Sequence, residues 1–293
     1  MNITATRFAT KARTWLLIAG LTALLIVIGS LLGGAFLYLF VGLAIAMNVA
    51  GYWFSDKLAL RASRAQPVEP GTMPEIEAMV QDLAVRAQVP VPRLYLIPSP
   101  QPNAFATGRN PSHAAVAVTE GLLQHLPPDQ VKGVLAHEFA HIKNRDILVM
   151  SIAAMVSGAI AAIANVMQFS LIFGGDDDDS PLGLVGTLVA IIVAPLAATL
   201  LQLAVSRQRE YLADATGAAL LGQAKPLADG LETLERGSQA LPMTHLNPAE
   251  ASLYAVNPLP RGGISSLFMT HPPMQERIRR LAEREAGGVP VLA

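Results

Sequence analysis

Two histidines flank a glutamate in the segment His137-Glu138-Phe139-Ala140-His141. If this segment is helical, the two imidazoles lie one turn apart on the same face. Imidazoles at that spacing can bind a single zinc ion, about 2.0–2.1 Å from each nitrogen. Glu138 lies at the rim of the same face, where its carboxylate can act as a general base toward a water molecule. The pattern therefore predicts one Zn²⁺ per chain and hydrolytic chemistry.

The third ligand of such a zinc ion must come from elsewhere, because a catalytic zinc usually has three protein ligands and one open position. The chain contains no cysteine, so the third ligand is His, Asp or Glu. Glu210 is the strongest candidate, because it begins a helix directly after one apolar segment, while the histidine helix ends directly before another. If these segments form a membrane hairpin, its ends lie close together and Glu210 comes near His141. The alternative is an ordinary interfacial glutamate, and His245 is then the next candidate ligand.

Asp214 lies one helical turn after Glu210 and shares its face. Its carboxylate can accept an N–H from a ligating histidine and so fix the tautomer of that ring. Two of the remaining histidines are expected at the surface, His113 in a turn and His125 at a helix end. The sequence thus predicts three ligands supported by one further carboxylate.

The elements that position these residues follow from hydrophobic periodicity and from turn residues. Pro127, Pro128 and Asp129 favour the start of the histidine helix, while Lys143 and Arg145 favour its carboxyl end. Residues 56–146 are predicted to form a small α+β unit. The other expected elements are helices at 74–84, 119–126, 206–221, 227–235 and 274–286, strands at 91–97, 103–107 and 114–119, and a long loop at 237–267.

The last helix, 274–286, carries several arginines. We expect them to form one solvated face, with contact to a membrane surface as the alternative. These residues are Arg277, Arg279, Arg280 and Arg284.

The composition indicates a membrane protein. Hydrophobic residues make up 52% of the chain and charged residues 15%, against a usual charged share of about 25%. The run from Trp15 to Phe54 contains no charged residue, and a single span needs about 20 residues. Two spans are therefore expected at about 14–32 and 35–54, and two more within 147–205. The net charge of −1 gives no indication of a nucleic-acid partner.

Three motifs, in this order, resemble the HtpX family of membrane zinc endopeptidases. They are H-E-F-A-H at 137–141, S-R-Q-R-E-Y-L-A-D at 206–214 and T-H-P-P-M-Q-E-R-I at 270–278. The N-A-F-A-T-G stretch at 103–108 and the four expected spans extend the resemblance over nearly the whole chain. This family is related to the CaaX prenyl proteases and belongs to the zincins whose third ligand is a glutamate. The resemblance implies a stress-related protease of the bacterial inner membrane that degrades misfolded membrane proteins on the cytoplasmic side.

The resemblance also implies where substrate is bound. By family analogy, strand 114–119 or its neighbour would offer an edge that pairs with an extended polypeptide. The expected substrate-binding residues are Asn103, Ala104, Phe105, Val116, Ala117 and Val118. His271, held outside the last helix by the two prolines that follow it, is a candidate to stabilise the tetrahedral oxyanion opposite the metal.

The predicted fold class is an α-helical membrane protein with two transmembrane hairpins, four spans in all, and an α+β zincin-like cytoplasmic metalloprotease domain. Residues 1–55 and 147–205 would form the hairpins, and residues 56–146 and 206–293 the two parts of the protease. Lys and Arg flank the outer ends of both hairpins, whereas the acidic run at 176–179 lies in a turn. By the positive-inside rule, the protease domain and both termini are then cytoplasmic.

Three other functions compete with a zinc-dependent endopeptidase. CaaX-type prenyl-peptide processing is the nearest in chemistry, but those enzymes usually carry more spans around a large chamber. A transporter or channel with a structural zinc site would require ionisable residues inside the spans, and the four apolar runs carry essentially none. A non-proteolytic zinc-binding scaffold would have no need of Glu138. The leading prediction is therefore an endopeptidase that acts on polypeptides, unfolded membrane proteins above all, at a lipid bilayer.

Overall fold

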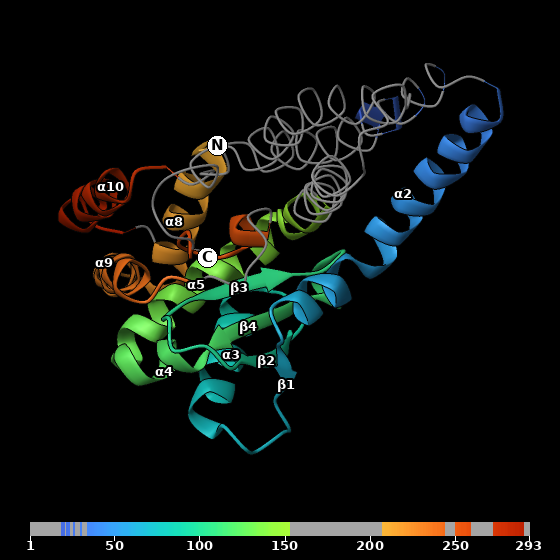
Figure 1. Cartoon of the computed structure of the whole chain (residues 1–293). Coiled ribbons are helices and arrows are strands. Elements are labelled where there is room, and N and C mark those ends of the chain that lie inside the picture. Colours follow the sequence, from blue (N-terminus) through green and yellow to red (C-terminus); the bar gives the residue numbers. More distant parts are fainter. Residues whose placement is uncertain are drawn as a thin grey trace.

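The computed structural model describes residues 34–152, 207–243, 250–258 and 272–289, and several residues between 19 and 30 (Figure 1). The elements in this part of the chain are the helices α2 (Gly34–Ala62), α3 (Pro74–Ala87), α4 (Glu120–His125), α5 (Pro128–Asn144), α8 (Arg207–Leu221), α9 (Lys225–Ala240) and α10 (Met274–Ala286), the strands β1 (Gln66–Pro67), β2 (Arg93–Ile97), β3 (Ala104–Thr107) and β4 (Ala115–Thr119), and the short 3₁₀ helices η1 (Pro111–His113) and η2 (Glu250–Leu253).

The strands form one four-stranded sheet in the order β1-β2-β4-β3. The β1–β2 and β3–β4 pairs are antiparallel, whereas β2 and β4 run parallel. The three strands expected from the sequence are confirmed to within two residues, and the short β1 is an addition. This mixed sheet, with helices packed on it, agrees with the predicted α+β unit.

The two faces of the sheet pack against different partners, because successive side chains of a strand point to opposite faces. Ala106 and Val116 belong to the larger buried cluster, which includes residues of α3, α5 and α9. Phe105 and Ala117 belong to a smaller cluster with the carboxyl-terminal end of α2 and Tyr254. In Figure 1 the rest of α2 extends away from the sheet. The sheet is therefore held between the α5 layer and the end of α2.

Helix α5 lies at the centre of the fold, in contact with α3, α8, α9 and β3. It begins with Pro128 at its first turn and ends at Asn144, as the flanking residues predicted. Helix α10 matches its predicted bounds, and the Thr119 side chain caps α4 by accepting the N–H of Leu122. These boundaries are confirmed because each depends on neighbouring residues alone.

Helix α9 continues to Ala240, so the loop predicted to begin at Gly237 is wrong at its start. Glycine disfavours helix interiors, which is why the sequence suggested an end there. In the fold, Gly237 packs directly on Pro102, and a Cβ atom at this position would lie 2.2 Å from Pro102 Cγ. This turn of the helix can pack so closely on Pro102 only because residue 237 has no side chain. Much of the remaining predicted loop, residues 244–249 and 259–271, lies outside the described residues.

The predicted spans are covered only in part by the structure. The span expected at 35–54 lies within α2, which continues to Ala62 without a break at residue 55. The span at 14–32 and most of the second hairpin, 147–205, lie outside the described residues. Within the parts of the chain that are described, no helix is both long enough and apolar enough to cross a membrane.

Candidate metal centre

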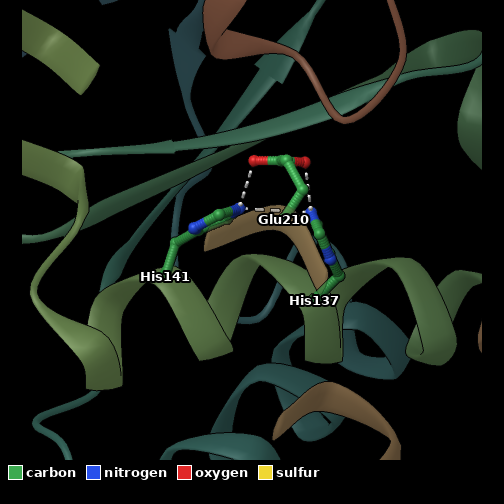
Figure 2. A group of neighbouring side chains, drawn as sticks. All are labelled: His137, His141 and Glu210. Carbon is green, nitrogen blue, oxygen red and sulfur yellow. Dashed lines mark hydrogen bonds and ion pairs between the residues drawn. The ribbon is translucent and has the colours of Figure 1, made fainter. Parts of the chain in front are cut away.

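Two helices bring the predicted ligand residues together. His137 and His141 project from one face of α5, and Glu210 reaches them from α8 (Figure 2). The two Nε2 atoms are 3.2 Å apart, and the Glu210 carboxylate oxygens lie 3.7 Å from His137 Nε2 and 3.5 Å from His141 Nε2. All three side chains are buried. One ligand atom from each lies within 4.8 Å of the others.

This donor set fits a zinc-type ion. Ligand atoms about 2.1 Å from a common tetrahedral centre lie about 3.4 Å from one another, close to the three observed separations. Two imidazole nitrogens and one carboxylate oxygen are the three ligands of one well-known class of catalytic zinc site, which leaves a fourth position open. Among the described residues, His137, His141 and Glu210 are therefore the group that could hold a metal ion.

Helix α8 can lie this close to α5 because Gly217 faces the histidine helix. A Cβ atom at Gly217 would lie 3.1 Å from the backbone nitrogen of His137 and 3.2 Å from the carbonyl carbon of Ala136. A larger side chain would push the two helices apart. Since Glu210 is carried by α8, the same displacement would move its carboxylate away from the histidines.

Glu138 is buried beside the ligand group. Burial raises the pKa of the Glu138 carboxyl to about 8, although His141 and a hydrogen bond from the backbone N–H of Ala106 act in the opposite direction. Ala106 belongs to β3, so the sheet itself fixes the place of this carboxylate. A proton-accepting group next to a metal site is what general-base catalysis requires.

Asp214 holds the outer nitrogen of His137. Its Oδ1 lies 3.0 Å from His137 Nδ1, as expected from its place one turn after Glu210. Burial lowers the pKa of His137 to about 4, so the ring is neutral and donates its Nδ1 proton to Asp214. Burial alone would raise the pKa of Asp214, but the guanidinium of Arg277 outweighs it and lowers the pKa to about 2. The Nε2 lone pair of His137 is thereby directed at the ligand group.

The outer nitrogen of His141 faces a different carboxylate. Asp146 Oδ2 lies 3.5 Å from His141 Nδ1. Burial lowers the pKa of His141, but in the metal-free protein the carboxylates of Asp146 and Glu210 outweigh it and raise the pKa to about 9; a bound metal ion would displace the proton from Nε2. Asp146 lies beyond the end of the histidine helix, so no helical spacing in the sequence relates it to the ligand residues.

The prediction that Arg277 lies on a solvated face is wrong. Its side chain is 0% exposed, whereas Arg279, Arg280 and Arg284 are exposed as expected. Arg277 donates from Nε and Nη2 to the two oxygens of Asp214, at 2.8 and 2.7 Å. The spacing of Arg277 from Met274 and Leu281, three and four residues away, places it on the buried stripe of α10. The spacing is visible in the sequence and indicates a buried position. The positive charge of arginine indicates an exposed one, and the prediction followed the charge.

We expect Arg277→Lys to destabilise the protein. Lysine keeps the positive charge but cannot form the paired hydrogen bonds to Asp214 or reach the carbonyl oxygen of Ala255, which Arg277 contacts at 3.1 Å. The loss of a charge-assisted hydrogen bond corresponds to about 1.5–3 kcal/mol of unfolding free energy. Thermal unfolding of the detergent-solubilised chain measures it, with the exposed Arg284→Lys as the matched control. An equal melting temperature in the two variants would contradict a structural role for the buried pair.

The predicted substrate-binding residues need correction. Strand β4 lies between β2 and β3, so Val116, Ala117 and Val118 belong to an internal strand and not to a free edge. Its neighbour β3, with Ala104 and Phe105, is one of the two outer strands of the described sheet, and β1 is the other. The side chains of all six predicted residues, Asn103 among them, are fully buried, so none of them forms part of an exposed edge. Asn103 instead donates to the carbonyl oxygen of Val256 at 2.8 Å.

The other histidines are placed as follows. His113 is exposed and pairs with Asn110, and His125 is exposed at the end of α4, both as expected. His245 and His271 lie outside the described residues, so their predicted roles stay predictions.

A mixed sheet, a helix with two histidines one turn apart beside it, and a glutamate from a second helix together define a zincin-type metallopeptidase. Comparison with known proteins agrees with this class. Residues 70–285 match the pattern of Peptidase family M48. The chain belongs to that family and, within it, to the HtpX proteases, and it is a metalloendopeptidase.

Relatives match this chain over most of its length. The Protease HtpX homolog of Syntrophobacter fumaroxidans is 51% identical over 277 residues, which cover 92% of this chain and 98% of the relative. That of Persephonella marina is 49% identical over 289 residues, covering 94% and 99%. The crystal structure of S. mikatae Ste24p has a TM-score of 0.52 and 20% identity, covering 94% of this chain and 67% of that one. The last likeness shows the fold alone.

Proposed function

We propose that this metalloendopeptidase uses zinc to hydrolyse peptide bonds of misfolded or damaged membrane proteins on the cytoplasmic side of a bacterial inner membrane. The observation that carries the proposal is the buried group of His137, His141 and Glu210 with Glu138 beside it. The donor set of two imidazoles and one carboxylate favours zinc over calcium or magnesium, which prefer oxygen ligands.

The chain's own residues account for the proton transfers of the reaction. Zinc, when bound, supplies a Lewis acid that polarises the scissile carbonyl and lowers the pKa of water. Glu138 takes the proton of the attacking water, for which the pKa raised by burial makes its carboxylate the stronger base, and then passes that proton to the leaving amine, which is more basic still. Asp214 keeps the proton of His137 on Nδ1, away from the ligand group. His271 would donate to the oxyanion from the opposite side.

Substrate would bind beside the Ala106 end of β3, because the outward-facing groups of Ala104 are already bonded within the chain. The N–H of Ala104 donates to Asn103 Oδ1 and its carbonyl oxygen accepts from the N–H of Ala255. An extended peptide can add itself to the outer strand of a sheet through main-chain hydrogen bonds. Because the N–H of Ala106 in β3 donates to Glu138, a peptide that lies beside this strand has its backbone next to the general base. The side chains of β3 are buried, so recognition would involve the backbone of the strand. Such recognition depends little on substrate sequence and suits a protease that acts on many unfolded chains.

The membrane location is supported by composition and by helix α2. Large apolar side chains are exposed along this helix, including Tyr38 at 80%, Ile45 at 59% and Trp53 at 50%. Exposed apolar surface of this kind marks contact with lipid or with another protein.

The cytoplasmic orientation requires that a label at Asp177 be reachable from outside intact cells and that one at Arg64 be protected.

Removal and return of the metal tests the proposed chemistry. We expect the full-length chain, purified in detergent and stripped by a chelator, to lose cleavage of an unfolded membrane protein. One equivalent of Zn²⁺ should restore it. A prenylated carboxyl-terminal peptide, offered in parallel, should be cleaved much more slowly. Activity that survives complete removal of metal would contradict the mechanism, and preferential cleavage of the prenylated peptide would favour CaaX-type processing.

A further inference from the structure

The Asp146 carboxylate is buried beside His141, and the proposed mechanism assigns it no role. Its side chain is 1% exposed. Neither oxygen has a hydrogen-bond partner within the described residues, and the His141 ring faces the carboxylate, with Nδ1 3.5 Å from Oδ2. Burial of a carboxylate is costly unless it is paired. The position therefore calls for a functional explanation.

The end of helix α5 places Asp146 beside His141. Arg145 adopts the left-handed conformation, with φ of 63°, and its N–H donates to the carbonyl oxygen of Ile142 at 3.1 Å. The N–H of Asp146 then donates to the carbonyl oxygen of His141 at 2.9 Å. These two bonds form a Schellman motif, which reverses the chain at the end of a helix. The reversal brings the Asp146 side chain back to the last turn of the histidine helix.

Hydrogen bonds fix the backbone after Asp146 as well as the backbone before it. Residues 147–152 are helical, and the N–H of Met150 donates to the carbonyl oxygen of Asp146 at 3.1 Å. Ser151 Oγ donates to the carbonyl oxygen of Ile147 and lies 2.7 Å from Thr107 Oγ1 in β3. Asp146 is thus held between two anchored segments, so its carboxylate stays at one place relative to His141.

The two histidines have similar surroundings, except that Arg277 Nη2 lies 3.4 Å from both ring nitrogens of His137. The Nε2 atom of each ring faces the other ring and Glu210, and the Nδ1 atom of each faces a carboxylate. For His137 this carboxylate is Asp214, and for His141 it is Asp146. A neutral imidazole has one N–H and one lone pair, and the partner of the N–H decides which nitrogen can bind a metal.

We propose that Asp146 is a positioning residue of the metal centre. It holds the proton of His141 on Nδ1 and thereby directs the Nε2 lone pair at the ligand group. The proposal rests on the zinc site of the proposed function. It concerns the role of Asp146 in metal binding and not a contact with substrate.

The test compares Asp146→Asn and Asp146→Ala with the parent, each as the full-length chain in detergent. The affinity for Zn²⁺ is measured by competition with a chromogenic chelator, and melting temperatures are measured with and without Zn²⁺. We expect Asp146→Ala to bind Zn²⁺ about 10–100-fold more weakly, as for other carboxylates that hold a ligating histidine. Asp146→Asn, which keeps an acceptor atom, should lose less. Asp129→Asn, at the exposed start of the same helix, is the matched control and should bind as the parent does.

The pattern of melting temperatures separates positioning from a purely structural role. A ligand stabilises the folded state in proportion to its affinity, so weaker binding shrinks the rise in melting temperature that Zn²⁺ produces. We expect this smaller rise, with no loss of melting temperature in the metal-free proteins, because the 3.5 Å contact with His141 is too long for a strong hydrogen bond before the metal ion orients the ring, and a buried carboxylate without such a bond does not stabilise the fold. An unchanged Zn²⁺ affinity in both variants, or equal losses of melting temperature with and without Zn²⁺, would overturn the proposal. Failure of the parent to bind Zn²⁺ would overturn the proposed function, and this inference with it.

Discussion

Replacement of Glu138 by Gln is expected to lower peptidase activity by about 10²–10⁴-fold, the usual contribution of a general base. Glutamine has the same shape but cannot take the proton of the attacking water. Its amide would still be held by the backbone of β3, where the N–H of Ala106 contacts the present carboxylate. The substitution therefore removes proton transfer and leaves the ligand residues His137, His141 and Glu210 in place.

The experiment measures cleavage and bound zinc on the same samples. Glu138→Gln should contain as much zinc as the parent, which separates loss of the base from loss of the metal. Glu120→Gln, an exposed substitution of the same kind on α4, is the control for the change itself. Activity within tenfold of the parent, with full zinc content, would show that another group accepts the proton. If the parent itself showed no cleavage, the alternative of a non-proteolytic scaffold would return to consideration.

The sequence predicted those features of the fold that depend on neighbouring residues. A helix with histidines four residues apart requires only a helical period and suitable ends, and α5 has both. The same is true of α10 and of the Thr119 cap of α4. The ligand residues His137 and His141 follow directly from this periodicity, because one turn of helix determines their geometry.

The position of Glu210 was predicted by a different argument. Its proximity to the histidines was inferred from a membrane hairpin that joins the two helices, and the structure shows that the residues do meet. The hairpin itself, within residues 147–205, lies mostly outside the described residues. The proximity is therefore observed, while its stated cause stays a prediction.

Long-range polar pairing could not be predicted from the sequence. Arg277 and Asp214 are 63 residues apart, and no local pattern relates an arginine on one helix to a carboxylate on another. The order of the strands could not be predicted either, because β2 pairs with β4 and not with β3, the next strand in the sequence. A strand pattern indicates which side chains share a face but not which strand lies beside it. The incorrect edge assignment of Val116–Val118 has this origin.

Replacement of Glu210 by Gln is expected to weaken zinc binding strongly. The loss should exceed the factor of about 10–100 that is usual when a carboxylate that only supports a ligating histidine is removed. The Glu210 oxygens lie 3.7 and 3.5 Å from the two Nε2 atoms, so this side chain is the one charged ligand of the group. An amide oxygen is a poorer zinc ligand than a carboxylate. The fold should survive, because the replacement is isosteric and removes a buried negative charge.

Two further variants provide comparisons for the zinc affinity of Glu210→Gln. Asp214→Asn should weaken zinc binding less than Glu210→Gln, because Asp214 acts through His137. It should lower the melting temperature more, since it removes the nearer of the two carboxylates that face the buried Arg277, at 2.7 Å against 3.8 Å for Glu210. Glu232→Gln, on the exposed face of α9, should change neither quantity. Metal ligation and structural support are thus separated, because each variant has the larger effect in a different measurement. If Glu210→Gln bound zinc as tightly as Glu232→Gln does, Glu210 would not be the third ligand, and His245 would be the residue to replace next.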